Sequence, residues 1–218
     1  MKQSNVKSNF VLTLSYNILH ILIPFVTTPY IARMLGAENL GIYSYSYSAA
    51  YIFVIFALLG LNNYGNRTIA SVRDDKEKLS RTFWDIYYMQ LGLSVIVLSA
   101  YVVYINIFCE YRLIAVLLIF YVISAAFDVT WFFFGIEYFK FTVIRNLVVK
   151  VLNLAAILLF VKKPDDLWLY TLIMALGSLA SQLFLWTVIR KYVGFRKPNY
   201  KRSVSHLKPN LILFIPVI

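Results

Sequence analysis

Long apolar stretches alternate with short charged gaps along the whole chain. Six of them reach the roughly 20 mainly apolar residues that a membrane-spanning helix needs, and a seventh starts near Leu207. The six expected spans are Phe10–Met34, Gly41–Tyr64, Thr82–Phe108, Leu113–Gly135, Phe141–Val161 and Leu167–Ile189. This pattern predicts an all-α polytopic membrane protein with six transmembrane helices and the start of a seventh.

The N-terminal residues MKQSNVKSNF are basic and lead into an apolar stretch, as in a signal peptide. No small-residue cleavage site follows, so we expect this stretch to remain as the first helix. We therefore expect a six-helix lobe over residues 1–189, a basic connector over 190–206 and a truncated start of a second lobe over 207–218. Ile218 carries no helix-ending signal, so we expect the sequence to be a fragment of a longer protein.

The composition supports the membrane assignment. Hydrophobic residues make up 61% of the chain and charged residues 14%, whereas soluble domains are about half apolar and about a quarter charged. The net charge is +11, which in a soluble protein would raise nucleic acid as a partner. Here the basic residues lie in the gaps between apolar stretches, so nucleic acid is not expected.

The basic residues also predict an orientation. Of the 21 Lys and Arg residues, 16 fall on the side that carries the N-terminus, four on the opposite side, and Lys150 lies within a span. Because cytoplasmic loops are enriched in Lys and Arg, we expect a cytoplasmic N-terminus, with the loops near 66–81, 135–141 and 190–207 inside. The longest of these, Arg190–Lys208, is expected to anchor the topology and touch anionic lipid headgroups, and it also suits a connector between two homologous halves.

One face of the fifth span is polar. Thr142, Asn146, Lys150 and Asn153 follow one another at i, i+4, i+8 and i+11, which places them on one side of a helix. A lysine near the bilayer centre costs about 2.5–3.5 kcal/mol on insertion scales, so it should face the bundle interior. Two interpretations stay open: Lys150 binds an anion in a cavity, or it pairs with Asp128 on the fourth span.

Other spans carry polar faces too. The first span has polar or helix-bending residues every three or four positions, which indicates either a water-lined face or a polar helix contact. These residues are Asn9, Thr13, Asn17, His20, Pro24 and Thr27. Pro24 and Pro29 are expected to kink or unwind this helix. Weaker polar groupings occur at Asp85, Tyr88, Gly92 and Ser99, at Tyr43, Tyr47 and Tyr51, and at Ser178, Ser181 and Gln182. Together they predict a bundle around a hydrated cavity, as in a transporter.

Motifs of enzymes and metal sites are missing from the sequence. It has no phosphate-binding loop, no HExxH, no GxSxG and no pair of cysteines. Cys109 is the single cysteine, and the two histidines match no ligand motif. We therefore predict a protein that is not an enzyme and has no catalytic residues, no cofactor and no metal.

Three stretches resemble one family in their order and spacing. They are SNF (8–10) continuing through Asn17 and Pro24 to TTPYIARMLGAENLGIYSYSYS (27–48), LGLNNYGNRTIA (59–70) and WFFFGIEYFKFTVIRN (131–146). This pattern resembles the Wzx-type polysaccharide flippases, which share a superfamily with multidrug and toxin extruders and lipid II flippases. The resemblance covers essentially the whole chain, although no single stretch is a catalytic-grade motif.

The resemblance implies one lobe of a two-lobe flippase in the cytoplasmic membrane of a bacterium. Such proteins move polyprenyl-pyrophosphate-linked oligosaccharides from the inner to the outer leaflet for capsule or O-antigen type polysaccharides. The implied partners are this lipid-linked oligosaccharide, membrane lipid and other polysaccharide-assembly proteins. Because a sugar–pyrophosphate headgroup cannot cross hydrocarbon unassisted, a hydrated, cationic cavity between the lobes is expected.

Candidate residues follow from this expectation. The cationic candidates for the pyrophosphate are Lys150, Arg145 and Arg33, and the hydrogen-bonding candidates are Asn17, Asn146 and Asn153. Two acids in the spans, Asp128 and Asp85, either bind a coupling proton or ion or form structural pairs.

Two other functions remain open at this point. A drug or ion antiporter of the same superfamily would share the bundle and its polar cavity. A membrane-embedded polysaccharide polymerase would be favoured by a large outward loop, and the loops on that side are short here.

Overall fold

The computed structural model describes the backbone of residues 6–214, and the side chains of 22–138 and 141–214. Every regular element in this part of the chain is a helix, and no strand occurs in it. The helices are α1 (Val6–Leu58), α2 (Leu61–Val72), α3 (Lys76–Ile107), α4 (Arg112–Leu117), α5 (Ile119–Ala126), α6 (Thr130–Gly135), α7 (Phe139–Phe160), η1 (Pro164–Asp166), α8 (Leu167–Ile189), α9 (Tyr200–Ser205) and α10 (Leu207–Phe214). The prediction of an all-α polytopic membrane protein is confirmed.

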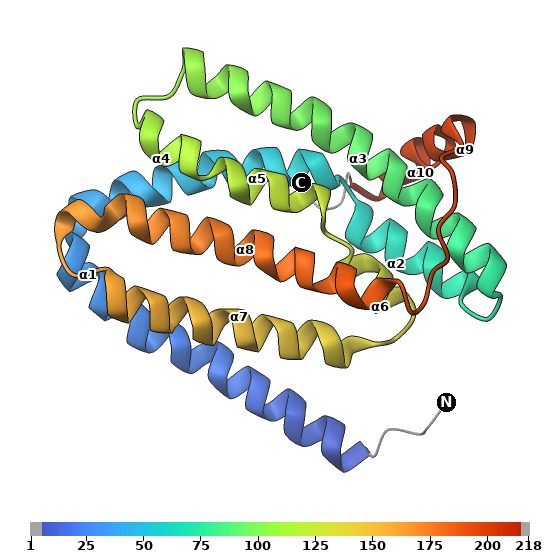
Figure 1. Ribbon diagram of the computed structural model, residues 1–218, viewed down its shortest axis with the longest axis horizontal. Coiled ribbons are helices and arrows are strands. Elements are labelled where there is room, and N and C mark those ends of the chain that lie inside the picture. The colour runs from blue at the N-terminus through green and yellow to red at the C-terminus, as the bar shows by residue number, and fades with distance from the viewer. Residues whose placement is uncertain (1–5, 215–218) are drawn as a thin grey trace.

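Five segments among the described residues are long and apolar enough to cross a membrane: Leu22–Val72, Lys76–Ile107, Arg112–Gly135, Phe141–Phe160 and Pro164–Ile189. The first of them contains the second predicted span, Gly41–Tyr64, and the part of the first, Phe10–Met34, that follows Leu22. Its helix α1 has 53 residues, or roughly 80 Å at 1.5 Å per residue, against a hydrocarbon core of about 30 Å. Figure 1 shows α1 folding back on itself near its middle.

The reversal of α1 occurs at Gly36. Its φ of 78° and ψ of 168° are non-helical, and a positive φ of this kind is readily adopted only by glycine. The chain is not unwound at Pro24 and Pro29, since both prolines lie inside helical backbone. Transmembrane helices tolerate proline where neighbouring groups satisfy the freed carbonyl.

The fourth predicted span, 113–135, is interrupted where the sequence shows an unbroken apolar stretch. Residues 127–129 separate α5 from α6, which leaves carbonyl groups outside the regular helical hydrogen-bond pattern. Gln90 on α3 donates from Nε2 to the carbonyls of Ala125 (2.7 Å) and Asp128 (2.8 Å), and the indole N–H of Trp131 donates to Gln90 Oε1 at 3.1 Å. On α8, Trp186 donates to the carbonyl of Phe127 at 3.0 Å. Side chains from three helices therefore satisfy the break.

Helices α2 and α6 approach each other at glycines. A Cβ on Gly65 would lie 2.7 Å from the Trp131 ring, and one on Gly135 would lie 2.5 Å from the Ile69 side chain. Small residues at such positions let helix backbones come close, which is how helices associate in lipid. The two family-like stretches 59–70 and 131–146 thus meet along this contact.

The loop predicted near 66–81 is mostly helical. Helix α2 continues to Val72, and α3 begins at Lys76 after a short turn. Asp75 caps α3 by accepting hydrogen bonds from the backbone N–H groups of Glu77 and Lys78, and the Lys78 bond is the largest cause that lowers the pKa of Asp75. Side-chain caps of this kind satisfy the otherwise unpaired amides of a helix start.

The basic segment after α8 lies against the bundle. It runs along α3 and leads into α9, as Figure 1 shows in red beside the green α3. Asp85, 6% exposed at its side chain, pairs with Arg202 of α9 at 3.1 Å. His206 Nδ1 lies 2.5 Å from the Tyr64 hydroxyl, and burial lowers the pKa of His206, which favours the neutral ring. These contacts join α9 and the start of α10 to α3 and α2.

The break between α5 and α6 predicts a strong dependence on Gln90. Replacing Gln90 with Leu removes two donors and one acceptor from buried partners, so the free energy of unfolding should fall by about 2–3 kcal/mol. The measurement is reversible unfolding of the purified protein in mixed detergent micelles. Ser99→Ala on the exposed face of α3 is the control, since its hydroxyl bonds only to a carbonyl of its own helix. Equal stability of Gln90→Leu and wild type would contradict this account of the break.

Candidate functional site

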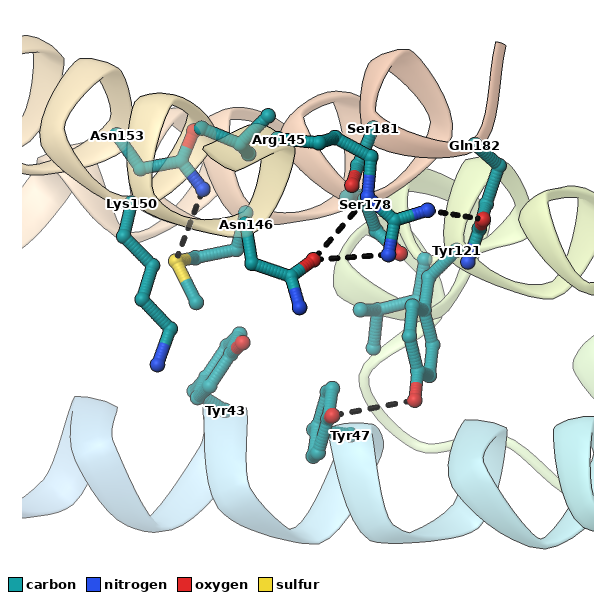
Figure 2. A pocket seen from close by; sticks show the side chains of 14 residues that line it. Tyr43, Tyr47, Tyr121, Arg145, Asn146, Lys150, Asn153, Ser178, Ser181 and Gln182 are labelled. Atoms are coloured by element: carbon teal, nitrogen blue, oxygen red, sulfur yellow. Dashed lines mark hydrogen bonds between the residues drawn. The ribbon is translucent and has the colours of Figure 1, made fainter. Parts of the chain in front are cut away.

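The reversal at Gly36 divides α1 into a first arm before it and a second arm after it. A polar cavity of about 310 Å³ lies between the second arm of α1, the α4–α5 region, α7 and α8. Figure 2 shows α1 on one side of it and the side chains of α7 and α8 on the other. Its lining residues are Tyr43, Tyr47, Leu118, Tyr121, Arg145, Asn146, Val149, Lys150, Asn153, Met174, Ala175, Ser178, Ser181 and Gln182.

The polar face predicted on α7 lines this cavity. Asn146, Lys150 and Asn153 are all among the lining residues, whereas Thr142 is buried outside it. In Figure 2 the Lys150 side chain extends from α7 toward α1 and ends near Tyr43. Within the described part of the chain, Lys150 makes no ion pair and no hydrogen bond. Its ammonium group therefore faces the cavity without a charged partner from these residues.

The pairing of Lys150 with Asp128, one of the two sequence interpretations, does not form in this structure. The carboxylate of Asp128 instead accepts a hydrogen bond from the backbone N–H of Thr130 at 2.8 Å, at the start of α6. Asp128 lines an adjacent cavity of about 330 Å³, which shares Tyr121, Ser178 and Gln182 with the first. The acid and the lysine thus belong to two neighbouring cavities.

Arg145 is held differently from Lys150. It is only 5% exposed. Its guanidinium donates to Asn146 Oδ1 at 2.8 and 3.1 Å and to Gln182 Oε1 at 3.0 Å. These acceptors are amide oxygens of neighbouring side chains, and they fix the orientation of the guanidinium at the cavity wall.

The α8 side contributes small hydroxyl groups and a close approach. Ser178 and Ser181 line the cavity, and the Ser178 hydroxyl lies 3.1 Å from that of Ser124. A Cβ on Gly177 would overlap the amide of Asn153. Gly177 therefore lets α8 come close enough to α7 for the two polar faces to share one cavity.

The α1 side is aromatic. The Tyr47 and Tyr121 hydroxyls are 3.1 Å apart, and the Tyr43 ring packs edge-on against Tyr170 with centroids 4.7 Å apart. The sequence shows Tyr43, Tyr47 and Tyr51 at steps of four, which predicts one helix face, but the proposed site did not include them. The signal that could have found them is this repeat, since a helix face made of tyrosines offers both rings and hydroxyls.

The remaining predicted residues lie elsewhere. Arg33 is exposed on the first arm of α1 and does not line the cavity, because the reversal at Gly36 separates it from the second arm. Asp85 is paired with Arg202 on another face of the bundle. Asn17 belongs to α1, but its side chain lies outside the described residues. Within the described part of the chain, no group of His, Cys, Asp and Glu side chains could hold a metal ion.

The arrangement suits an anion that also carries hydroxyl groups. Two cations supply charge, amides and hydroxyls supply donors and acceptors, and tyrosine rings supply apolar faces. Binding sites commonly combine apolar walls with a few placed polar groups in this way.

The contact between Gly177 and Asn153 gives a test of the cavity geometry. Gly177→Ala should lower the free energy of unfolding by about 1–3 kcal/mol, because α8 must move or Asn153 must leave its position. Adding Asn153→Ala should restore part of this loss, with a coupling of about 1 kcal/mol in a double-mutant cycle. The measurement is unfolding in mixed micelles. Gly92→Ala on α3 is the matched control, since a Cβ there meets nothing within 4 Å. Additive effects of the two substitutions would contradict the contact.

Comparison with known proteins finds two similar curated proteins and one matching family. One, from Escherichia coli (strain K12), is 24% identical over 171 residues, covering 77% of this chain and 41% of the relative. Another, from Shigella dysenteriae, is 25% identical over 210 residues, covering 95% of this chain and 51% of the relative. Each is described as "Putative O-antigen transporter".

The chain spans about half the length of the curated relatives that it matches, 41% and 51%. No solved structure matches it. A family model described as polysaccharide biosynthesis protein matches residues 6–214, nearly the whole chain. The chain therefore belongs to the polysaccharide biosynthesis protein family, as the resemblance to polysaccharide flippases indicates.

Proposed function

We propose that this chain lines part of the path by which a polyprenyl-pyrophosphate-linked oligosaccharide moves from the inner to the outer leaflet of the bacterial cytoplasmic membrane. The observation that carries the proposal is Lys150, whose ammonium group faces the cavity without an ion pair from the described residues. A lysine costs free energy inside a span, so such residues usually serve a substrate or ion pathway.

The cavity chemistry fits the headgroup of such a lipid. The pyrophosphate carries negative charge that Lys150 and Arg145 would offset, and the sugar hydroxyls would bond to Asn146, Asn153 and Ser181. The tyrosines of α1 and α5 offer aromatic faces on which sugar rings could lie. The polyprenyl tail needs no cavity, since it can stay in the lipid while the headgroup passes through the protein.

The cavity around Lys150, at about 310 Å³, is near the lower end of the range for ligand pockets, about 300–1,000 Å³. Together with the adjacent cavity of about 330 Å³, it forms a polar zone between α1, α5, α7 and α8. Transport also requires that access alternate between the two sides, with one ligand shifting the balance between two conformations. The excess of Lys and Arg on the side of the N-terminus supports a cytoplasmic placement of that side.

The principal alternative is drug or ion antiport by the same bundle. The relatives described as O-antigen transporters favour the polysaccharide precursor. Lys150 favours it too, since a cation in the cavity repels the cationic drugs that many antiporters export. A strain lacking the gene that loses drug resistance but keeps its surface polysaccharide would establish the alternative instead.

The proposal predicts that Lys150 is required for export. With Lys150→Leu introduced into the chromosomal gene, surface polysaccharide should fall at least about 10-fold, because a charge-assisted contact of roughly 1.5–3 kcal/mol is lost. Lys150→Arg should keep a substantial part of the export. The measurement is immunoblotting of surface polysaccharide, together with accumulation of the lipid-linked precursor in membrane extracts.

Loss of folding would not explain that result. Leu is cheaper than Lys inside a span, so Lys150→Leu should reach the membrane in at least the wild-type amount. Lys162→Leu is the matched control, since Lys162 follows α7 and lies outside the cavity. Full export by Lys150→Leu, at wild-type protein levels, would refute the cationic role.

We also propose Asp128, rather than Asp85, as the group that couples transport to a proton or cation. Asp128 lines a cavity and contacts no cationic side chain among the described residues, whereas Asp85 is paired with Arg202. Asp128→Asn should keep the local turn, because an amide oxygen can still accept the Thr130 N–H.

Proteoliposomes with an imposed proton or sodium gradient provide the measurement for Asp128. Transport of the lipid-linked oligosaccharide by Asp128→Asn should become insensitive to the gradient, while its thermal stability stays near wild type. Asp165→Asn, in the exposed turn before α8, is the control. A full gradient response in Asp128→Asn would exclude the coupling role.

A further inference from the structure

A separate cavity of about 570 Å³ lies where the basic segment after α8 crosses the first turns of α3. Its lining residues are Arg81, Asp85, Phe195, Arg196, Lys197 and Arg202. None of them lines the cavity around Lys150 or the one around Asp128. Four of the six are cationic, so this cavity would select an anion.

The walls of this cavity are held in place by hydrogen bonds. On α3, Trp84 donates from Nε1 to the carbonyl of Gly194 at 2.8 Å, and Tyr88 donates to the carbonyl of Arg196 at 3.2 Å. In return, the N–H of Gly194 donates to the Ser80 hydroxyl at 3.1 Å. The segment is therefore fixed on α3 through its backbone.

Carboxylates neutralise only part of the positive charge. Arg81 and Arg196 share Glu77, at 3.2 and 3.3 Å, and Arg202 contacts Asp85 at 3.1 Å. Lys197 forms no ion pair with any described residue. Four cations against two carboxylates leave a surplus of two positive charges. Each arginine also engages a carboxylate through a single nitrogen, so further N–H groups remain to bind oxygen atoms of an anion.

Apolar side chains surround the charged cavity and point to an amphiphilic anion. Phe195, which lines it, is 72% exposed, and Tyr200 at the start of α9 is 80% exposed. Val204 is exposed on α9 as well. The cavity also adjoins the first turns of α3, a candidate span of 32 residues. Because about 20 residues cross the hydrocarbon, we expect these first turns to lie at the level of the lipid headgroups. Aromatic and basic side chains are typical of this boundary.

We propose that this cavity binds the phosphate headgroup of an anionic membrane phospholipid, with the acyl chains lying against Phe195, Tyr200 and Val204. Arg81, Arg196, Lys197 and Arg202 would surround the phosphate. A lipid bound there would hold the basic segment and α9 against α3. This role does not depend on transport through the Lys150 cavity.

The test uses the purified chain in nanodiscs of phosphatidylcholine, with and without phosphatidylglycerol. Native mass spectrometry then reports the phosphatidylglycerol retained by the protein. The double variant Arg81→Gln/Lys197→Gln should bind it at least about 30-fold more weakly, since it loses two charge-assisted contacts to the bound phosphate. Arg202 is left intact, because its loss would leave the buried Asp85 without a partner.

The matched control is Lys76→Gln/Lys191→Gln, which removes the same charge from exposed positions outside the cavity. It should retain phosphatidylglycerol as the wild type does. Equal losses in both double variants would show general attraction to anionic membranes and overturn the proposal. A phosphate group could come from a lipid headgroup or from a free phosphate in solution. Inorganic phosphate and glycerol phosphate, added to phosphatidylcholine nanodiscs, distinguish these two sources. Retention of either at the wild-type affinity for phosphatidylglycerol would overturn the role of the acyl chains.

Discussion

A backbone carbonyl without a hydrogen-bond donor inside hydrocarbon costs several kcal/mol. The helices of this bundle converge on one place where the backbone would otherwise incur that cost. The chain leaves helical geometry at 127–129, in the middle of an apolar stretch. Donors to the carbonyls beside the break come from Gln90 on α3, from Trp131 on α6, whose indole N–H reaches the Asp128 carbonyl at 3.1 Å, and from Trp186 on α8. Because these three helices must converge on the break, their positions relative to α5 are defined. The same break places the carboxylate of Asp128 in a cavity wall.

Two cations five residues apart on α7, the buried Arg145 and the half-buried Lys150, are held in different ways. Arg145 is surrounded by amide oxygens, which orient it. Lys150 is left facing the cavity. An arginine has five N–H donors in a rigid plane and can be fixed by several neutral acceptors, whereas a lysine carries a compact charge on a flexible stem. Arg145 is thus suited to a standing positive potential, and Lys150 is suited to follow a ligand that moves.

The periodicity of the sequence predicts which residues share one face of a single helix. Of the four residues that the spacing places on one face of α7, Asn146, Lys150 and Asn153 line one cavity, whereas Thr142 does not. Features that depend on distant residues could not be predicted. The interruption after α5 occurs in an apolar stretch and is stabilised by Gln90, which lies 35 residues before Ala125. Asp85 pairs with Arg202, far along the chain, and Arg33 lies on the other side of the reversal at Gly36 from the residues of α1 that line the site.

Positive charges are distributed differently in two regions of the protein, because the free-energy cost of a charge differs between them. In the cavity on α7 a charge is expensive, so few are present and each is placed precisely. At the start of α3 a charge costs less free energy, since water and headgroups would solvate it, and several charged side chains gather around one cavity. A transporter that handles a phosphate-bearing lipid must release it as well as bind it. Under the proposed function, a small number of cations in the path, with the larger number at the membrane boundary, would keep the substrate from binding too tightly to be released.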